Sequence, residues 1–211
     1  MTDPSAEVRE FLRRLGPAVI VDTETSGRDP ERHALLELGM VFVRDGLVVA
    51  EWFAGIEAWE GAEEEPEAMV VNGYRDRYRL GTPMPAEGAL RLAVQAGRQV
   101  LGSDRPWTWI GHNVPFDRRF VASSVARVVA NNPGAREACD LMSCFGYRDV
   151  DTMALATVPY VVGAIPSRSL DAVAAAAGKT RPAGQPHTAI DDAERTFEAL
   201  VWLLGGLRWA A

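Results

Sequence analysis

The chain has 211 residues, of which 47% are hydrophobic and 24% are charged, and its formal net charge is −7. This length allows one substantial hydrophobic core, and the composition is ordinary for a soluble globular protein. The first residues carry charges every few positions, unlike a secretory signal peptide, and no apolar run approaches the roughly 20 residues that span a bilayer. The cysteines, Cys139 and Cys144, have neither CxxC nor zinc-ligand spacing, so we expect both to be reduced in a cytoplasmic protein.

The first third of the chain contains a helix followed by three predicted strands. Apolar residues recur at helical spacing over about 4–15, and Gly16-Pro17 ends this helix. The Asp45-Gly46 pair between two apolar runs is a strong signal for a β-hairpin. We therefore expect three antiparallel strands at the start of the sheet. They cover 18–21, 35–43 and 47–53.

The rest of the chain alternates helices with short strands. Residues 55–85 are irregular, with a short helix at 66–72, and the six Glu of 57–68 predict a solvated acidic loop. Further helices are expected at 86–101, 115–130, 153–160, 169–177 and 188–204, and further strands at 107–111 and 148–151.

No repeat or low-complexity linker divides this pattern. We predict one α/β domain, built on a mixed sheet with antiparallel first three strands and helices on both faces. Its parts are an N-terminal helix within 1–17, a main domain at 18–204 and a C-terminal tail at 205–211.

Three segments place acidic residues where a strand ends or a helix begins. In VDTETSG, Asp22 and Glu24 follow a buried strand and point to one face, because side chains alternate along a strand. In GHNVPFD, Asp117 lies near the start of a helix, where the dipole favours a carboxylate. In HTAIDD, Asp191 and Asp192 occupy the first turns of the last predicted helix. Each segment alone also fits an ordinary turn or helix cap.

His187 precedes Asp192 by five residues. On one helix these two side chains would lie about 140° apart, because each residue rotates by about 100°. We therefore expect His187 in the preceding loop, after Pro186, where it can reach over whatever Asp192 binds. A lone histidine in a loop is more often an exposed residue than a catalyst.

Together and in this order, the three segments resemble the DEDDh family of 3′→5′ exonucleases, which includes relatives of proofreading subunits, oligoribonuclease and ribonuclease T. The resemblance covers about residues 18–204, and it extends to LLELGMVFV, which contains Glu37, and to SLDAVAAAAGK. It implies a ribonuclease H-like fold. It also implies an enzyme that hydrolyses phosphodiesters at the 3′ end of single-stranded DNA or RNA and releases 5′-mononucleotides.

The resemblance further implies a two-metal site with a histidine base. His187 would be the general base, and Asp192 is preferred to Asp191 because the family places its ligand five residues after the histidine. The implied ligands of two divalent cations, Mg²⁺ or Mn²⁺, are Asp22, which would bridge the ions, Glu24, Asp117 and Asp192. Two such ions stabilise the attacking and the leaving oxygen of a phosphodiester, and they prefer oxygen ligands. A histidine titrates near neutral pH and can accept the proton of the attacking water.

Four other positions are implied in substrate binding. Thr25 and Asn113 match positions that lie against the terminal nucleotide in the family. Arg28 stands where an apolar wedge residue often follows the glycine, and Asn72 replaces the usual histidine of its segment. We expect these two departures to affect the hold on the substrate and not the chemistry.

Two other functions use similar features. A haloacid-dehalogenase-like phosphatase also starts from a carboxylate after a strand, but it requires DxDxT/V and a later lysine, whereas the second acid here is Glu24. A non-catalytic nucleic-acid or polymerase-binding module on the same fold normally lacks one of the ligands, and all five positions are filled here. The sequence leaves open the choice between DNA and RNA, and whether a polymerase or a second copy is a partner; no membrane partner is expected.

Overall fold

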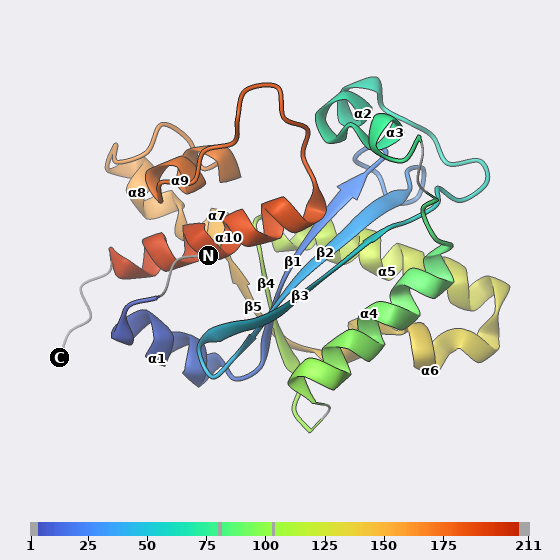
Figure 1. Ribbon diagram of the computed structural model, residues 1–211, viewed down its shortest axis with the longest axis horizontal. Helices are drawn as coiled ribbons and strands as arrows, with labels where there is room; N and C mark the ends of the chain where they lie inside the picture. Colours follow the sequence, from blue (N-terminus) through green and yellow to red (C-terminus); the bar gives the residue numbers. More distant parts are fainter. Residues whose placement is uncertain (1–3, 80–81, 103, 207–211) are drawn as a thin grey trace.

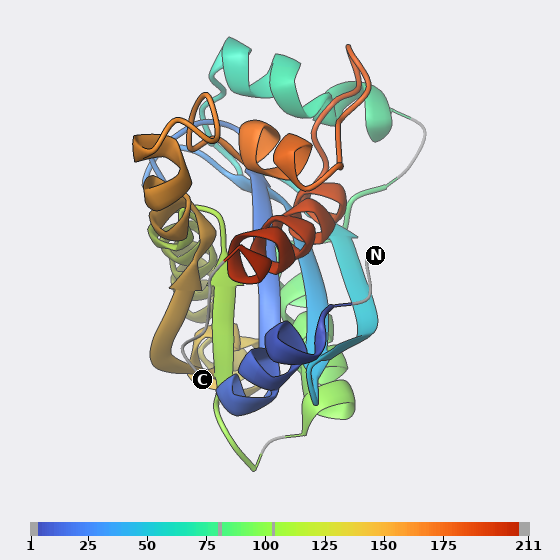
Figure 2. The same ribbon diagram turned by 90° about the vertical axis from the view of Figure 1, so that its left-hand side faces the viewer.

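The computed structural model describes residues 4–79, 82–102 and 104–206. A five-stranded sheet with the order β3-β2-β1-β4-β5 lies at its centre, with helices on both faces (Figure 1, Figure 2). β1, β2 and β3 are antiparallel neighbours, whereas β4 and β5 continue the sheet in parallel with β1. The predicted mixed sheet is confirmed. Its strands are β1 Ala18–Thr25, β2 Leu35–Arg44, β3 Leu47–Gly55, β4 Trp107–Gly111 and β5 Phe145–Asp151.

The long helices lie where the sequence predicts them. The helix expected at 153–160 is instead divided into two short helices, because Pro159 has no amide hydrogen to continue the helical hydrogen bonds. Two further four-residue helices were not predicted, since one turn is too short to show a hydrophobic period. The helices are α1 Ala6–Leu15, α2 Pro66–Asn72, α3 Tyr74–Arg77, α4 Ala86–Leu101, α5 Val114–Asn131, α6 Arg136–Cys139, α7 Thr152–Leu155, α8 Thr157–Val161, α9 Leu170–Ala176 and α10 Ala189–Gly205.

Two strands are longer than predicted by three residues or more. β1 continues through the polar residues to Thr25, because β2 pairs with it along this whole length. β5 starts at Phe145, where it pairs with Trp107 of β4. The hairpin between β2 and β3 is confirmed, with Asp45 and Gly46 both at positive φ, 55° and 79°. Two adjacent positive φ angles are characteristic of the tight hairpin turn that matches strand twist.

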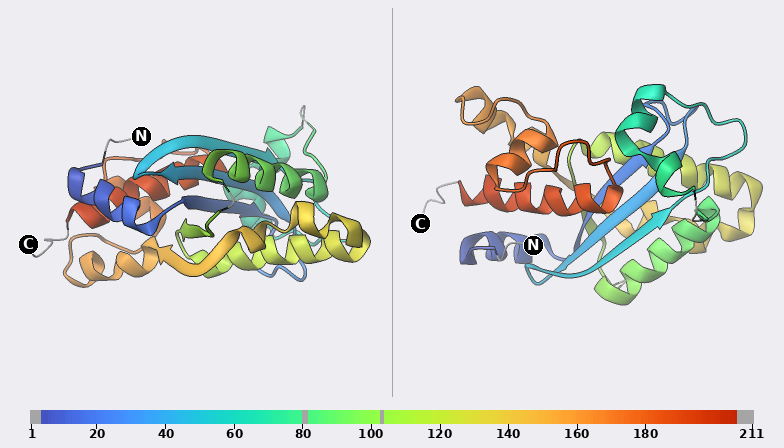
Figure 3. Two further views of the ribbon diagram at one scale, coloured as in Figure 1. Left: turned by 90° about the horizontal axis from the view of Figure 1, so that it is seen from below. Right: turned by 45° about the horizontal axis from the view of Figure 1, so that its top comes forward.

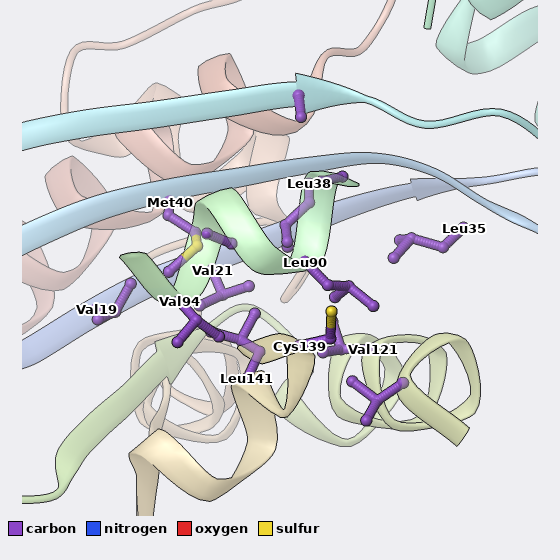
Figure 4. Packing of buried hydrophobic residues seen from close by; sticks show 14 of the residues in the cluster. Val19, Val21, Leu35, Leu38, Met40, Leu90, Val94, Val121, Cys139 and Leu141 are labelled. Carbon is purple, nitrogen blue, oxygen red and sulfur yellow. The ribbon is translucent and has the colours of Figure 1, made fainter. Parts of the chain in front are cut away.

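Alternation along β1 divides the core into two layers. Ala18 and Ile20 pack with residues of α1 and α10 on one face, which Figure 2 shows in front of the sheet. Val19 and Val21 pack with α4 and α5 on the other face, in the layer shown in Figure 4. Cys139 is buried in this second layer, and neither Cys139 nor Cys144 forms a disulfide.

The acidic segment 57–68 is largely exposed, as its composition predicted, but it also makes fixed contacts with the rest of the protein. The backbone of Glu65 donates a hydrogen bond to the Ser26 carbonyl, and the Ser26 hydroxyl donates to the Glu63 carbonyl. Three glutamates also form ion pairs, Glu63 with Arg32, Glu64 with Arg75 and Glu65 with Arg28. Two of these arginines lie more than 30 positions away in the sequence. The segment therefore fastens the loop after β1 to the α2–α3 layer.

The two ends of the chain, which were predicted to flank the main domain, are described only in part. Residues 1–3 of the predicted N-terminal region and 207–211 of the predicted tail lie outside the described residues. Within the described ranges, no helix combines the length and apolarity that crossing a membrane requires.

Candidate active site

The ends of β1, α5 and α10 bring the predicted acidic residues together. Asp22 and Glu24 have the same parity on β1 as Ile20, so they face α10. Thr23 faces the opposite way, and its hydroxyl donates a 2.8 Å hydrogen bond to Oδ1 of Asp117 on α5. This threonine, which the sequence did not single out, joins the two faces of the site.

One pocket of about 270 Å³ opens at this end of the sheet. All five predicted catalytic residues line it. The lining consists of Asp22, Thr23, Glu24, His112, Phe116, Asp117, Ser169, Leu170, Asp171, His187 and Asp192. The structure therefore places in one cavity residues that are up to 170 positions apart in the sequence.

Asp117 is positioned by the first turn of α5. The backbone amides of Asn113 and Val114 donate hydrogen bonds of 3.1 and 3.2 Å to the Asp151 carboxylate. Asn113 has φ of 73°, which turns the chain sharply from β4 into the helix. Asp117 then faces inward and is 3% exposed.

Asp192 is positioned by the first turn of α10. The Thr188 hydroxyl caps this helix by accepting a hydrogen bond from the Asp191 amide at 3.1 Å. Gly39 of β2, the register partner of Asp22, allows the helix to approach, because a Cβ there would lie 2.4 Å from the Ala189 backbone. Asp192 is 4% exposed and lines the pocket, whereas Asp191 does not.

His187 lies in the loop before α10, as predicted. Its amide donates to the carbonyl of Val71 on α2 at 2.9 Å, and its Nδ1 lies 2.8 Å from Oδ2 of Asp192. Figure 3 shows α2, α3 and this loop together at the end of β1. Among the described residues, the structure records no hydrogen-bond partner for Nε2 of His187.

His112 is a second histidine in the pocket, which sequence reasoning missed. Its Nδ1 lies 2.9 Å from the Thr152 hydroxyl, and its Nε2 lies 2.9 Å from the Arg168 carbonyl. Burial lowers the pKa of this imidazole. Both ring nitrogens of His112 are therefore engaged inside the protein.

The carboxylates at the centre of the site repel one another. Burial, followed by the charges of Asp117, Asp192 and Glu24, raises the pKa of Asp22 well above its ordinary value. Burial, followed by the charges of Asp192 and Glu37, raises the pKa of Glu24 to about 8. Burial raises the pKa of Asp117 to about 7. The folded protein holds these acids where positive charge would stabilise their ionised forms.

Asp192 differs because basic groups surround it. Burial alone would raise its pKa, but the His187 hydrogen bond and the charges of Arg181 and Arg195 lower it. Arg181 and Arg195 both bind Oδ1 of Asp192, the second at 3.1 Å. Arg195 follows Asp192 by three residues on a helix, a spacing from which the contact could have been inferred. Arg181 comes from the loop between α9 and α10, and nothing in the sequence indicated its contact.

The four predicted substrate-binding residues lie outside the pocket lining. The Thr25 hydroxyl donates to the Gly27 carbonyl at 2.6 Å, and the Asn72 amide donates to the Thr25 carbonyl at 3.0 Å. Asn113 is exposed at the start of α5, and the Arg28 side chain is 83% exposed beside Glu65. Thr25 and Asn72 therefore stabilise the loop after β1, and contact with a nucleotide stays a prediction for all four.

The donor set fits divalent cations. Glu24, His187 and Asp192 can each offer one ligand atom within 4.8 Å of one another. Asp22 and Asp117 add carboxylate oxygens on the same pocket wall. Hard cations such as Mg²⁺ and Mn²⁺ favour such oxygen ligands, and their charge would neutralise the repulsion described above.

The chain was compared with known proteins, and no family model matches it. Ribonuclease T of Shewanella sp. (strain MR-4) is 28% identical over 203 residues, which cover 90% of this chain and 82% of that protein. Ribonuclease T of Shewanella denitrificans is 28% identical over 201 residues, covering 92% of this chain and 81% of that protein.

Solved structures of exonucleases share the fold. E. coli Exonuclease I in complex with a dT13 oligonucleotide has a TM-score of 0.66 at 15% identity, over 90% of this chain and 41% of that chain. The nuclease domain of 3′hExo, a DEDDh family member bound to rAMP, has a TM-score of 0.62 at 14% identity, over 97% of this chain and 96% of that chain. The chain thus spans less than half of Exonuclease I. The chain is therefore similar in sequence to ribonuclease T and shares its fold with exonucleases of known structure, one of them a DEDDh family member.

Proposed function

We propose that this protein is a divalent-metal-dependent 3′→5′ exonuclease that removes 5′-mononucleotides from the 3′ end of single-stranded DNA or RNA. The observation that carries the proposal is the convergence of four carboxylates and His187 on one pocket. The named complexes of the structural relatives, one with a dT13 oligonucleotide and one with rAMP, support a nucleic-acid substrate of either sugar.

The carboxylates of Asp22, Glu24, Asp117 and Asp192 would hold two divalent cations, Mg²⁺ or Mn²⁺. When bound, these ions stabilise negative charge on the attacking and the leaving oxygen of the phosphodiester. Thr23 orients the Asp117 carboxylate through its 2.8 Å hydrogen bond, so it is a positioning residue of the site.

His187 is the proposed general base. Because its Nδ1 faces the Asp192 carboxylate at 2.8 Å, the favoured tautomer carries the proton on Nδ1. The Nε2 lone pair is then able to accept the proton of the attacking water. His112 lacks such a nitrogen, because both of its ring nitrogens have partners inside the protein.

The test uses purified protein and 5′-labelled single-stranded DNA and RNA of one sequence. In Mg²⁺ or Mn²⁺ we expect products shortened progressively from the 3′ end together with 5′-mononucleotides, and in EDTA we expect none. Binding of the oligonucleotide without metal-dependent shortening would contradict the proposal and favour a non-catalytic module. Release of inorganic phosphate from a small phosphomonoester, without shortening, would favour a phosphatase. The cytoplasmic location and a polymerase or homodimer partner remain predictions.

A further inference from the structure

Both oxygens of the Asp192 carboxylate are occupied by other side chains. Oδ2 faces Nδ1 of His187 at 2.8 Å, and Oδ1 accepts hydrogen bonds from Arg181 and Arg195. The Asp192 side chain is only 5% exposed, so water contributes little to its environment. A metal ion that binds Asp192 must therefore displace or share at least one of these three partners.

Arg195 is held independently of Asp192. It lies on α10, and its guanidinium also donates to Oδ1 of Asp171 on α9 at 2.6 Å. This second contact fastens Arg195 between two helices. Arg195 therefore fixes the direction of the Asp192 side chain.

Arg181 has a different setting. It belongs to the loop 177–188, which also carries His187, and it donates to the Pro186 carbonyl at 3.0 Å. Its side chain is only 10% exposed; its Nε, like that of Arg195, makes no hydrogen bond within the described part of the chain, and it lies 4.0 Å from Oδ1 of Asp171. The charge of Arg181 also lowers the pKa of both Asp22 and Glu24. Arg181 therefore supplies positive charge to Asp22 and Glu24 as well as to Asp192, which it binds directly.

We propose that Arg181 is an internal counter-cation of the metal site, which neutralises the carboxylates in the metal-free protein and which a divalent cation displaces from Asp192. This inference rests on the proposed function. An arginine in this position stabilises the fold without metal, because it offsets repulsion among buried acids. It also weakens metal binding, because each ion must first compete with a guanidinium. Arg181 is thus a positioning residue that sets the metal affinity.

The test measures Mn²⁺ binding by isothermal titration calorimetry in wild type and R181Q, with thermal denaturation in EDTA as a second readout. We expect Mn²⁺ to bind R181Q about tenfold more tightly, a change of one decade in the dissociation constant. We also expect R181Q to melt at a lower temperature than wild type in EDTA. Saturating Mn²⁺ should raise the melting temperature of R181Q more than that of wild type, because stabilisation by a ligand grows with its affinity.

Three variants serve as controls. R168Q removes an equal charge from an exposed side chain that binds Thr157, and its Mn²⁺ affinity should equal that of wild type. R195Q also loses a contact with Asp192, but it should bind Mn²⁺ no more tightly than wild type, because Arg195 orients the ligand. R181K keeps the charge, so its affinity should lie between those of wild type and R181Q; it also provides the measurement if R181Q does not fold in EDTA.

The outcomes separate this inference from the proposed function. Equal or weaker Mn²⁺ binding by R181Q, with metal-dependent shortening of oligonucleotides by wild type, would overturn the role of Arg181 alone. Tighter binding by R195Q to the same extent as by R181Q would also overturn it, because the effect would then belong to any arginine on Asp192. A wild-type protein that neither binds Mn²⁺ nor shortens oligonucleotides would overturn both.

Discussion

Asp22 lies at the centre of the acidic cluster, where burial and then three other carboxylates raise its pKa. Replacement by Ala should abolish turnover at saturating Mg²⁺, because the variant lacks the ligand that we propose to be shared by both ions. In EDTA the D22A variant should melt at the same or a higher temperature than wild type, since one source of repulsion is gone. Mononucleotide release and thermal denaturation measure these effects. A rate above about a tenth of wild type, a loss under about 1.4 kcal/mol, would contradict the bridging role.

The neighbouring acids Asp191 and Asp192 form a matched pair for mutation. Asp192 is buried in the pocket wall, whereas Asp191 lies outside the pocket lining. D192N should lower the turnover number by at least ~10³-fold, equivalent to about 4 kcal/mol of transition-state stabilisation. D191N should retain nearly full activity. Steady-state rates of the two variants decide the matter, and the reverse ranking would place the ligand one residue earlier.

His187 offers a test of the base separate from the metal. H187A should be slower by about 10²–10⁴-fold, the usual contribution of a positioned proton acceptor. Its Mn²⁺ isotherm should still show binding, because the carboxylates remain. Single-turnover rates at saturating metal measure the loss. An H187A enzyme as fast as wild type would reduce His187 to a loop residue that supports Asp192.

At this scale the sequence predicted the charged residues of the site but not their neighbours. The five proposed catalytic residues could be found because their types and spacings are distinctive. Thr23 and Arg181 could not, since a threonine in a strand and an arginine in a loop are common, and their contacts depend on folding. The side chains of Thr25 and Asn72 form hydrogen bonds within the protein that the sequence did not indicate, and their contact with a substrate stays a prediction.

The short helix α3 connects the edge of the site to the sheet through one side chain. Arg77 donates to Glu37 of β2 at 2.8 Å, to the Asn72 carbonyl and to the His187 carbonyl at 2.8 Å. The other oxygen of Glu37 accepts the Ala189 amide at 3.1 Å, so Glu37 also caps α10. Arg77 and Glu37 therefore hold α2, α3 and the His187 loop in one arrangement.

We expect R77Q to destabilise the protein by about 3–5 kcal/mol, because it leaves the fully buried Glu37 carboxylate without its charged partner. R75Q is the matched control on the same helix. Arg75 is 72% exposed and pairs with Glu64, so its loss should cost only about 0–1 kcal/mol. Urea unfolding monitored by circular dichroism measures both values. Equal stability of the two variants would contradict the structural role of Arg77.

Helices and strands could be predicted where apolar residues recur at regular spacing in the sequence. α4 and β4 have the predicted limits, because their apolar residues recur regularly and clear turn residues flank them. β1 was predicted four residues too short, because its end is polar on account of the site that it builds. The ion pairs of the acidic segment also escaped prediction, since they join parts of the chain that only the fold brings together.

Across the whole molecule, the acidic cluster makes stability depend on pH. The pKa values of Glu24 and Asp117 are about 8 and about 7, above their ordinary values of 4.5 and 3.8. The folded state therefore binds protons more tightly than the unfolded state, and each carboxylate loses stabilising free energy as pH rises through this interval. His112 acts in the opposite direction because its pKa is lowered, but it is one group against several carboxylates.

In EDTA the free energy of unfolding should thus fall as pH rises from about 5 to about 8. Saturating Mn²⁺ should remove most of this fall, because bound cations favour the ionised carboxylates. Urea unfolding at several pH values, with EDTA or Mn²⁺, checks the prediction, and D22A in EDTA should show a shallower slope than wild type. A stability that rises over this interval in EDTA would contradict the acidic cluster as described.

The order of the site residues along the sequence has a consequence for biosynthesis. Asp22 lies near the start of the sequence, whereas Asp192 arrives on α10, which packs across β1 and β2. Ribosomes deliver the N-terminal part first, so β1 emerges long before the helix that completes the metal site. Until residues 187–192 have left the ribosome, the cluster lacks both Asp192 and His187. The proposed nuclease therefore stays inert amid messenger and ribosomal RNA until α10 has left the ribosome.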